Sequence, residues 1–416
     1  MKQRPPPISK VIFYAPLRIY PMKNNLFAFI LLIFSAKTPF AQTYKAGDTY
    51  LGKNNYTEYR AGSLPIIITA PHGGRLEPTT IPDRTCATCT TVMDANTMEL
   101  AYQIDTALQQ VFGCFPHIIV NRLHRIKMDA NREIVEAAGG SPDAETAWRE
   151  WHQYIQAAKD SIVRRYGRGL LIDLHGHGHT IQRLEIGYLL DGSQLRLSDS
   201  VLSTPQYRDQ LSIKNLVLNN LNNFNAAQLL RGPFALGTLL GANNFPSVPS
   251  QQDVAPMVND LYFNGGYNTL RHGSRDSTKV DALQIECNFT GVRNTFTTRQ
   301  VFANQLAMTL KTYLSKHYFS STNFGCRTPI QDVNAVQMCI FPNPAKQELT
   351  IHLDKNVQTS YQLQLYNLLG QSIFQENIVP AETVTVALPP LSIGTYFLTM
   401  RNEKGELVGR SKVFIE

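Results

Sequence analysis

The chain has 416 residues, with 39 Lys and Arg against 32 Asp and Glu and a pI near 9.0. Its hydrophobic content of 43% can fill buried cores and excludes global disorder. The basic balance does not indicate a nucleic-acid-binding protein, because residues 1–41 hold six basic and no acidic residues, which leaves 33 basic against 32 acidic in the rest. The length predicts two or three domains.

An export signal is predicted near the N-terminus. Leu26–Phe34 is an unbroken apolar run, much shorter than the roughly 20 residues that a transmembrane helix needs. Such a run is typical of a secretory signal peptide. We therefore expect residues 1–41 to be a signal peptide region, with translation starting at Met22 and cleavage after Ala41. No other stretch is apolar enough to predict a stable membrane span.

The cysteines fit an exported protein. There are six of them, and an even number permits disulfides in an oxidising compartment. Cys86 and Cys89 are spaced for a local bridge. A redox site is less favoured, because no thioredoxin-like strand–helix pattern surrounds the pair.

Strand and helix patterns alternate over residues 42–325, which are expected to form one catalytic domain. Short apolar runs predict strands over 64–70, 117–120, 170–174, 184–190 and 282–287. Apolar residues at helical spacing predict helices over 96–111, 143–165 and 298–316. This alternation predicts an α/β fold with a parallel or mixed sheet, whose binding sites lie at the carboxyl ends of the strands.

A second domain is predicted after a polar linker over residues 326–337. Short alternating segments over 338–416 predict a small all-β sandwich. Four blocks in it resemble the C-terminal sorting domain of the type IX secretion system of Bacteroidetes: Phe341–Pro344, Tyr366–Gln371, Leu391–Phe397 and Lys412–Ile415. The resemblance implies passage across the outer membrane, to the cell surface or the medium, with the type IX machinery as partner. The alternative is an accessory carbohydrate-binding or adhesion sandwich.

Four polar motifs follow the predicted strands of the first domain. They are Pro71-His72-Gly73-Gly74, Arg125 with Asp129-Ala130-Asn131-Arg132, Asp173-Leu174-His175-Gly176-His177-Gly178-His179, and Gln284-Ile285-Glu286-Cys287-Asn288. Imidazoles are common zinc ligands, a guanidinium can grip a carboxylate, and a carboxylate at the end of a buried strand is costly unless it is paired or functional. A structural histidine at position 72, or an Asp129–Arg132 ion pair at a helix start, are the alternatives.

In this order the motifs resemble the N-formylglutamate amidohydrolase family, which is similar to zinc carboxypeptidases and aspartoacylase, over about residues 60–316. The resemblance implies a zinc-exopeptidase-like hydrolase fold with Zn²⁺ held by His72, His175 and one carboxylate. The related His-x-x-Glu signature is absent, because Arg75 stands at its last position. Asp94 is the expected third ligand and Glu77 is the alternative.

The resemblance also implies roles for the remaining residues. Glu286 is expected to take a proton from water and deliver it to the leaving amine, and Arg125 to stabilise the oxyanion. A substrate carboxylate is expected at Asn131, Arg132 and Arg271, with His177 and His179 lining the pocket. The predicted activity is hydrolysis of the amide bond of an N-acyl amino acid or a small peptide-like carboxylate. A carboxypeptidase-like metallopeptidase, or a non-catalytic surface binding protein on a degenerate hydrolase fold, are the alternatives.

Overall fold

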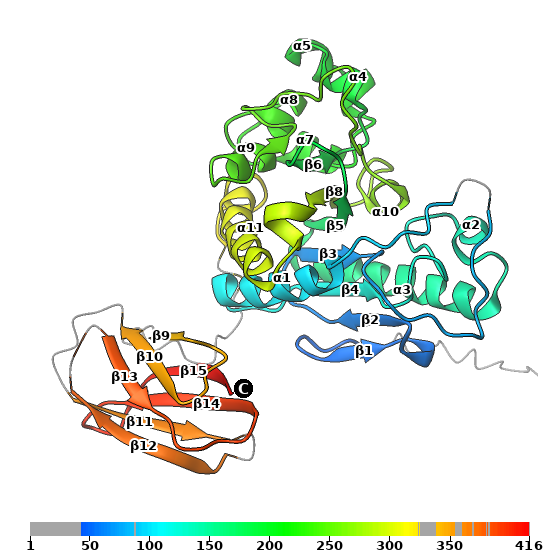
Figure 1. Cartoon of the computed structure of the whole chain (residues 1–416). Helices are drawn as coiled ribbons and strands as arrows, with labels where there is room; N and C mark the ends of the chain where they lie inside the picture. The colour runs from blue at the N-terminus through cyan, green and yellow to red at the C-terminus, as the bar shows by residue number, and fades with distance from the viewer. Residues whose placement is uncertain are drawn as a thin grey trace, which may run out of the picture. The chain divides into compact units, whose positions relative to one another are not determined.

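The computed structural model describes residues 43–86, 89–322, 324, 338–353, 360–367, 370–379, 381 and 383–415. The expected signal peptide region, with its start at Met22, and the expected linker lie outside these residues. The described residues form an α/β region and a C-terminal β region, each considered by itself (Figure 1). In neither does a helix combine the length and the hydropathy needed to cross a membrane.

An eight-stranded mixed sheet forms the centre of the α/β region, in the order β1-β2-β4-β3-β5-β8-β6-β7. The strands are β1 (Thr49–Leu51), β2 (Thr57–Arg60), β3 (Ile66–Ala70), β4 (His117–Asn121), β5 (Gly169–His177), β6 (Leu184–Gly187), β7 (Ser247–Val248) and β8 (Val280–Asn288). The four central strands β4, β3, β5 and β8 are parallel, and β2 and β6 run antiparallel to their neighbours β4 and β8. The predicted mixed sheet is therefore confirmed.

The central strands are buried on both faces, which is why their sequences are continuous apolar runs. In β3, Ile66 and Ile68 belong to one core and Ile67 to the opposite one. The first core packs α1 (Thr97–Phe112) and α11 (Phe296–His317), and the second packs α2 (Ile134–Ala138) and α3 (Pro142–Tyr166). The result is a helix–sheet–helix sandwich (Figure 1).

Local sequence explains the ends of α3. The Ser141 hydroxyl caps the helix by accepting a hydrogen bond from the Ala144 amide, and Pro142 occupies the first turn. Gly167 ends the helix at a φ of 75°, in the left-handed region that glycine adopts without strain. The predicted helix over 143–165 is therefore one residue short at each end.

Short helices fill the segment between β6 and β8, for which the sequence predicted no structure. They are α4 (Gly192–Leu195), α5 (Asp199–Leu202), α6 (Pro205–Arg208), α7 (Lys214–Asn219), α8 (Ala226–Arg231), α9 (Leu236–Gly241) and α10 (Tyr267–His272). A 3₁₀ turn, η1 (Lys53–Asn55), follows β1, and a π turn, η2 (Phe289–Arg293), follows β8. Of these, α10 lies beside the candidate site.

The C-terminal β region consists of two antiparallel sheets, β13-β10-β9 and β12-β11-β14-β15. The strands are β9 (Met338–Phe341), β10 (Glu348–Leu353), β11 (Tyr361–Tyr366), β12 (Ser372–Ile378), β13 (Thr383–Ala387), β14 (Gly394–Arg401) and β15 (Leu407–Ile415). Leu349 and Ile351 of one sheet share a buried core with Leu363 and Leu398 of the other. The region is the sandwich that its alternating pattern predicted.

Candidate functional site

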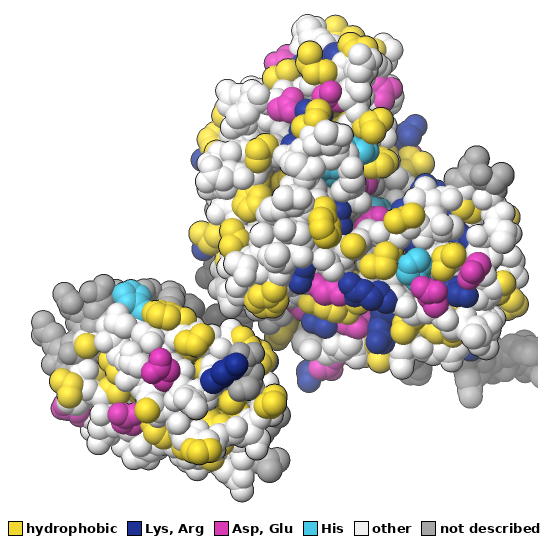
Figure 2. Space-filling model, viewed as in Figure 1, with side chains coloured by type: hydrophobic (Ala, Val, Ile, Leu, Met, Phe, Trp, Pro, Cys, Tyr) yellow, Lys and Arg dark blue, Asp and Glu magenta, His cyan; other side chains and the backbone are white. Residues whose placement is uncertain are grey.

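A cavity of about 610 Å³ lies at the carboxyl ends of β3, β5 and β8, and all four predicted motifs contribute to its lining. In β5 and β8, Leu174 and Ile285 point into the core packed by α1 and α11. Asp173, His175 and Glu286 alternate with them and therefore project from the opposite face of the sheet. Charged and histidine side chains gather in a recess of the α/β region (Figure 2).

His72, Asp94 and His175 meet in this cavity. The Nδ1 atoms of the two imidazoles are each 3.3 Å from Oδ2 of Asp94. Asp94 lies in the loop that leads into α1, where its main-chain N donates to His72 O and its carbonyl accepts from Thr97. Asp94, the carboxylate expected to be the third ligand, therefore lies beside both histidines.

The outer nitrogen of each imidazole is held by a buried carboxylate. His72 Nε2 is 2.7 Å from Asp129 Oδ1, and His175 Nε2 is 2.8 Å from Asp173 Oδ2. A carboxylate only accepts hydrogen bonds, so each Nε2 carries a hydrogen, and when the ring is neutral its Nδ1 presents a lone pair to Asp94. Three electron-pair donors then face one another, an arrangement that a bound cation stabilises.

The charges of the site agree with this geometry. Burial favours the neutral form of Asp94, but the fields of His72 and His175 and their hydrogen bonds hold the pKa of Asp94 well below its ordinary value. Burial alone would lower the pKa of His175, but Asp173 and Asp94 raise it well above its ordinary range. The carboxylates around these imidazoles thus favour a positive charge between them.

The donor set fits a divalent metal ion. Two imidazole nitrogens and one carboxylate oxygen, all within 4.8 Å of one another, are a common three-ligand set for zinc. Ligand atoms bound to a tetrahedral zinc lie roughly 3.3 Å apart. The two Nδ1–Oδ2 distances have that value, whereas a charge-assisted hydrogen bond is usually shorter.

Glu286 lies on the strand next to His175, since the two residues are paired in the register of β5 and β8. Its Oε1 accepts a hydrogen bond of 2.8 Å from Gln284 Nε2, and its side chain lines the cavity. Burial raises the pKa of Glu286 to about 8, although the His175 charge lowers it. A carboxyl group with a pKa near neutrality can exchange protons at working pH.

Arg125 and Asn131 lie in the cavity wall. Arg125 Nε donates to Asp129 Oδ2 at 2.9 Å, and its Nη1 is 3.5 Å from Asp94 Oδ1. The carboxamide oxygen of Asn131 is used within the protein, because Oδ1 accepts from the Asn268 amide of α10. Asn131 therefore ties α10 to the site. Asp129 pairs with His72 and Arg125, which differs from the helix-start pair with Arg132 that was the structural alternative.

Arg132 also lines the cavity, and its Nε donates to Glu136 at 3.1 Å. Arg271 does not line it. The Arg271 guanidinium lies over the Trp148 ring and borders a separate cavity on the other side of α10, so the expectation that it reaches the same substrate is corrected. Glu77 is exposed at the surface, 3.9 Å from His124 Nε2, and is not part of the metal-binding group.

One residue of the cavity lining, Arg293, had no signal in the sequence. Its guanidinium donates to the carbonyls of Cys287, His177 and Ala95, and so joins the ends of β5 and β8 to the loop that carries Asp94. Gly176 makes room for it, since a Cβ at this position would lie 2.2 Å from Arg293 Cζ. This also explains why β5 continues through His177 instead of ending at Leu174.

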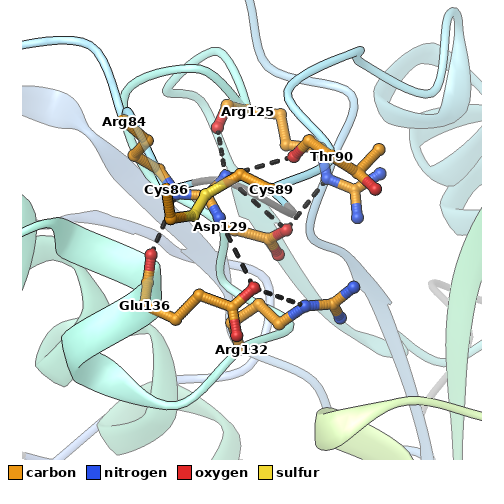
Figure 3. The surroundings of a disulfide bond; sticks show 8 residues. All are labelled: Arg84, Cys86, Cys89, Thr90, Arg125, Asp129, Arg132 and Glu136. Atoms are coloured by element: carbon orange, nitrogen blue, oxygen red, sulfur yellow. Dashed lines mark hydrogen bonds and ion pairs between the residues drawn. A yellow bond between two sulfur atoms is a disulfide. The ribbon is translucent and has the colours of Figure 1, made fainter.

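The predicted Cys86–Cys89 bridge is present and lies next to Arg84 (Figure 3). The buried Arg84 guanidinium donates to the carbonyls of Thr90, Arg125 and Glu136. Its Nη1 is also 3.8 Å from Asp129 Oδ2. Arg84 therefore connects the disulfide loop to the carboxylate that orients His72.

A second group of potential ligands, His177, His179 and Glu185, lies in the same cavity region. His179 Nδ1 is 2.7 Å from Glu185 Oε1. His177 Nε2 donates to Arg183 O at 2.8 Å, and its Nδ1 accepts from the His179 amide at 3.1 Å. Both nitrogens of His177 are therefore already engaged.

Comparison with known proteins identifies the C-terminal β region. Residues 339–416 match the family model of the secretion system C-terminal sorting domain. This confirms the predicted type IX sorting domain, and with it export to the cell surface or the medium through that machinery. No curated protein matches the sequence of the chain.

Several solved structures resemble parts of the chain. N-formylglutamate amidohydrolase from Ralstonia eutropha JMP134 is 12% identical, with 64% of this chain and 95% of that chain covered and a TM-score of 0.35. A DUF3244 family protein with an immunoglobulin-like β-sandwich from Bacteroides vulgatus ATCC 8482 is 12% identical, with 19% and 84% covered and a TM-score of 0.16. PorZ, a surface component of the type IX secretion system of Porphyromonas gingivalis, is 13% identical, with 19% and 11% covered and a TM-score of 0.15.

Proposed function

We propose that the α/β region is a zinc-dependent amidohydrolase that is exported and acts on an N-acyl amino acid or a small peptide-like carboxylate. One observation carries the proposal. His72 and His175 present their Nδ1 atoms to Asp94 while a buried carboxylate holds each Nε2. Metal-ligating histidines typically donate their outer N–H to such a partner, which fixes the ring and raises its basicity.

His72, Asp94 and His175 would hold the ion. Zinc bound there supplies Lewis-acid polarisation of a carbonyl and makes water a stronger acid. The two imidazoles and Asp94 leave the side of the group that faces the cavity for substrate and water. Three protein ligands with one open position are the pattern of catalytic zinc sites, whereas structural sites use four.

Glu286 is the proposed general base. Its carboxyl group is buried in the cavity wall on the strand beside His175, and a carboxylate in this position can accept a proton from water. Arg125 would stabilise the developing oxyanion. Its Nε is held by Asp129, so the guanidinium is oriented before the substrate binds.

The substrate proposal rests on the charges at the cavity wall. Arg132 lines the cavity with a half-buried guanidinium, the group that best matches a carboxylate. Asn131 is proposed to support this end of the cavity through α10. We propose that Arg132 binds the carboxylate of the substrate while its amide bond lies at the metal group. A substrate that places both groups in one cavity is a small one.

The test combines metal analysis with hydrolysis assays on the full chain. A panel of N-formyl amino acids, N-acetyl amino acids and dipeptides would be assayed. Each would be measured with the purified protein, after treatment with a chelator, and after zinc has been added back. We expect zinc-dependent release of a free amine from one class, and Glu286→Gln should keep its zinc but lose turnover about 10³-fold. Zinc content well below one ion per chain, or full turnover by Glu286→Gln, would contradict the proposal.

A further inference from the structure

His179 lines the proposed active-site cavity and is paired with the buried Glu185, and neither residue has a part in the function described so far. His179 follows β5 and lines the cavity. Glu185 lies on β6, directly opposite Glu286 in the register of β6 and β8. The sequence motif that carries His179 therefore ends beside the proposed general base.

The imidazole of His179 is held in one orientation. Its Nδ1 is 2.7 Å from Glu185 Oε1, and the other oxygen of Glu185 accepts the Phe263 amide at 2.8 Å. The Phe263 ring stacks on the imidazole, with centroids 4.8 Å apart and planes at 17°. Since the carboxylate only accepts, Nδ1 carries a hydrogen, and no described residue hydrogen-bonds to Nε2.

The geometry distinguishes this pair from a second metal site. The Nδ1–Oε1 distance of 2.7 Å is that of a charge-assisted hydrogen bond and leaves no room for an ion between the two atoms. The third potential ligand, His177, spends both ring nitrogens on backbone groups. A buried carboxylate that orients an imidazole is instead the arrangement of acid–base catalysts, in which the carboxylate stabilises the imidazolium.

We propose that His179, oriented by Glu185, is a catalytic residue that protonates the leaving amine. The inference rests on the proposed amidohydrolase function. Glu286 takes one proton from the attacking water, and the hydroxyl adds to the amide carbon. The C–N bond then breaks, and its electron pair on nitrogen takes the Nε2 proton of the His179 imidazolium. Glu286 then passes its proton to His179, which restores the starting protonation state of both residues.

This assignment divides two proton transfers between two side chains on neighbouring strands. From the sequence we expected Glu286 to carry out both proton transfers, and its Oε1 is already hydrogen-bonded to Gln284. A separate donor removes the need for one buried carboxyl group to reach both the water and the departing nitrogen. The role of Glu185 is positioning, since it acts on the substrate only through His179.

The experiment compares two leaving groups in the full chain. The probes are the N-acetyl amino acid hydrolysed fastest by the unaltered protein and the S-acetyl 2-mercapto acid with the same side chain. A thiol is acidic enough to leave as thiolate and needs no proton, whereas an amine must be protonated. His179→Ala should lower kcat for the amide about 100-fold and for the thioester less than about threefold. Added imidazole should restore about a tenth of the amide turnover.

Three controls separate this role from others. His179→Ala should keep the zinc content of the unaltered protein, and Glu286→Gln should lose both substrates. His177→Gln removes a neighbouring imidazole whose two ring nitrogens hydrogen-bond to backbone groups, and it should affect both substrates equally. Equal losses for both substrates in His179→Ala, or loss of its zinc, would overturn the inference alone. No zinc-dependent hydrolysis of any N-acyl amino acid or dipeptide of the panel by the unaltered protein would overturn the proposed function together with it.

Discussion

Two groups of three potential metal ligands contribute side chains to one cavity, and they differ in the distances between their atoms. In His72, Asp94 and His175, the facing atoms are 3.3 Å apart, and the outer nitrogens are bound to buried carboxylates. In the second group, His179 and Glu185 are 2.7 Å apart and hydrogen-bonded to each other. The two groups contain the same types of residue, so residue type alone does not indicate a metal site. The distances between the facing atoms, and the partners of the outer nitrogens, distinguish the two groups.

The largest expected effect separates the two groups directly. His175→Ala removes one proposed ligand, so its zinc content after dialysis should fall below about 0.1 ion per chain and turnover should disappear. His179→Ala, the matched variant of the second group, should keep about one zinc per chain. Metal analysis of both purified proteins checks this. Equal zinc in the two variants would break the comparison.

Asp281 is a buried carboxylate outside the cavity, and it forms no ion pair with any described residue. It therefore contrasts with Asp94, which lies between two imidazoles. Burial raises the pKa of Asp281 to about 6, although Ser274, Tyr318 and the Leu216 amide donate hydrogen bonds to it. Between about pH 4 and pH 6 the unfolded chain releases this proton while the folded chain keeps it, so stability falls as pH rises through that window. Asp281→Asn should remove up to about 3 kcal/mol of this pH dependence.

The measurement for Asp281 is urea unfolding of the chelator-treated chain, followed by tryptophan fluorescence. Both tryptophans, Trp148 and Trp151, lie in α3 of the α/β region, so the signal reports that region. Identical pH dependence in the variant and the unaltered chain would show that folding does not raise the pKa of Asp281. Asp94, whose pKa is lowered by His72 and His175, shows the opposite behaviour of a buried carboxylate with positive partners.

The carboxylates behind the imidazoles are expected to matter less than the ligands themselves. Asp129→Asn keeps the shape of the side chain but weakens its grip on His72 Nε2 and Arg125. Zinc affinity should fall about 10–100-fold. Glu185→Gln, which alters the carboxylate of the second group, should leave zinc affinity unchanged. Competition with a chromogenic chelator measures both, and a similar loss in the two variants would argue for a shared metal site.

The smallest effect concerns the substrate end of the cavity. Arg132→Ala should raise KM for a carboxylate-bearing substrate about tenfold with little change in kcat, because it removes binding shared by ground state and transition state. Arg271→Ala is the matched control, since Arg271 borders the other cavity and should leave KM unchanged. Steady-state kinetics checks both. A raised KM in Arg271→Ala alone would show that the substrate carboxylate binds at the other cavity, beside Arg271.

The parts of the fold that the sequence predicted are those with local signals. The apolar spacing of α3 located it to within one residue at each end, and four short blocks identified the sorting domain. The short helices α4–α9 were missed, because four to six residues are too few for a periodic pattern. The continuation of β5 was missed because two glycines between histidines resemble a loop, and only Arg293 explains Gly176.

The same limit applies to the site. His72, His175 and Glu286 were found because each directly follows or ends an apolar run. Asp94 was chosen over Glu77 from its sequence surroundings, and the exposure of Glu77 agrees with that choice. Arg84, Arg293 and Glu185 gave no signal. Arg84 and Arg293 each reach a carbonyl that lies 41 and 198 residues away, and Glu185 faces Glu286 from another strand. Arg271 was misassigned because sequence does not tell which side of α10 a side chain faces.

The three proposed ligands come from distant points of the chain, at positions 72, 94 and 175. An unfolded chain brings no two of them together, so it presents no preformed metal site. On the proposed function, the ion therefore binds after these segments have folded, and it stabilises the folded state by binding only that state. For an exported protein, the supply of ions in the compartment where folding finishes then decides which metal the proposed site receives.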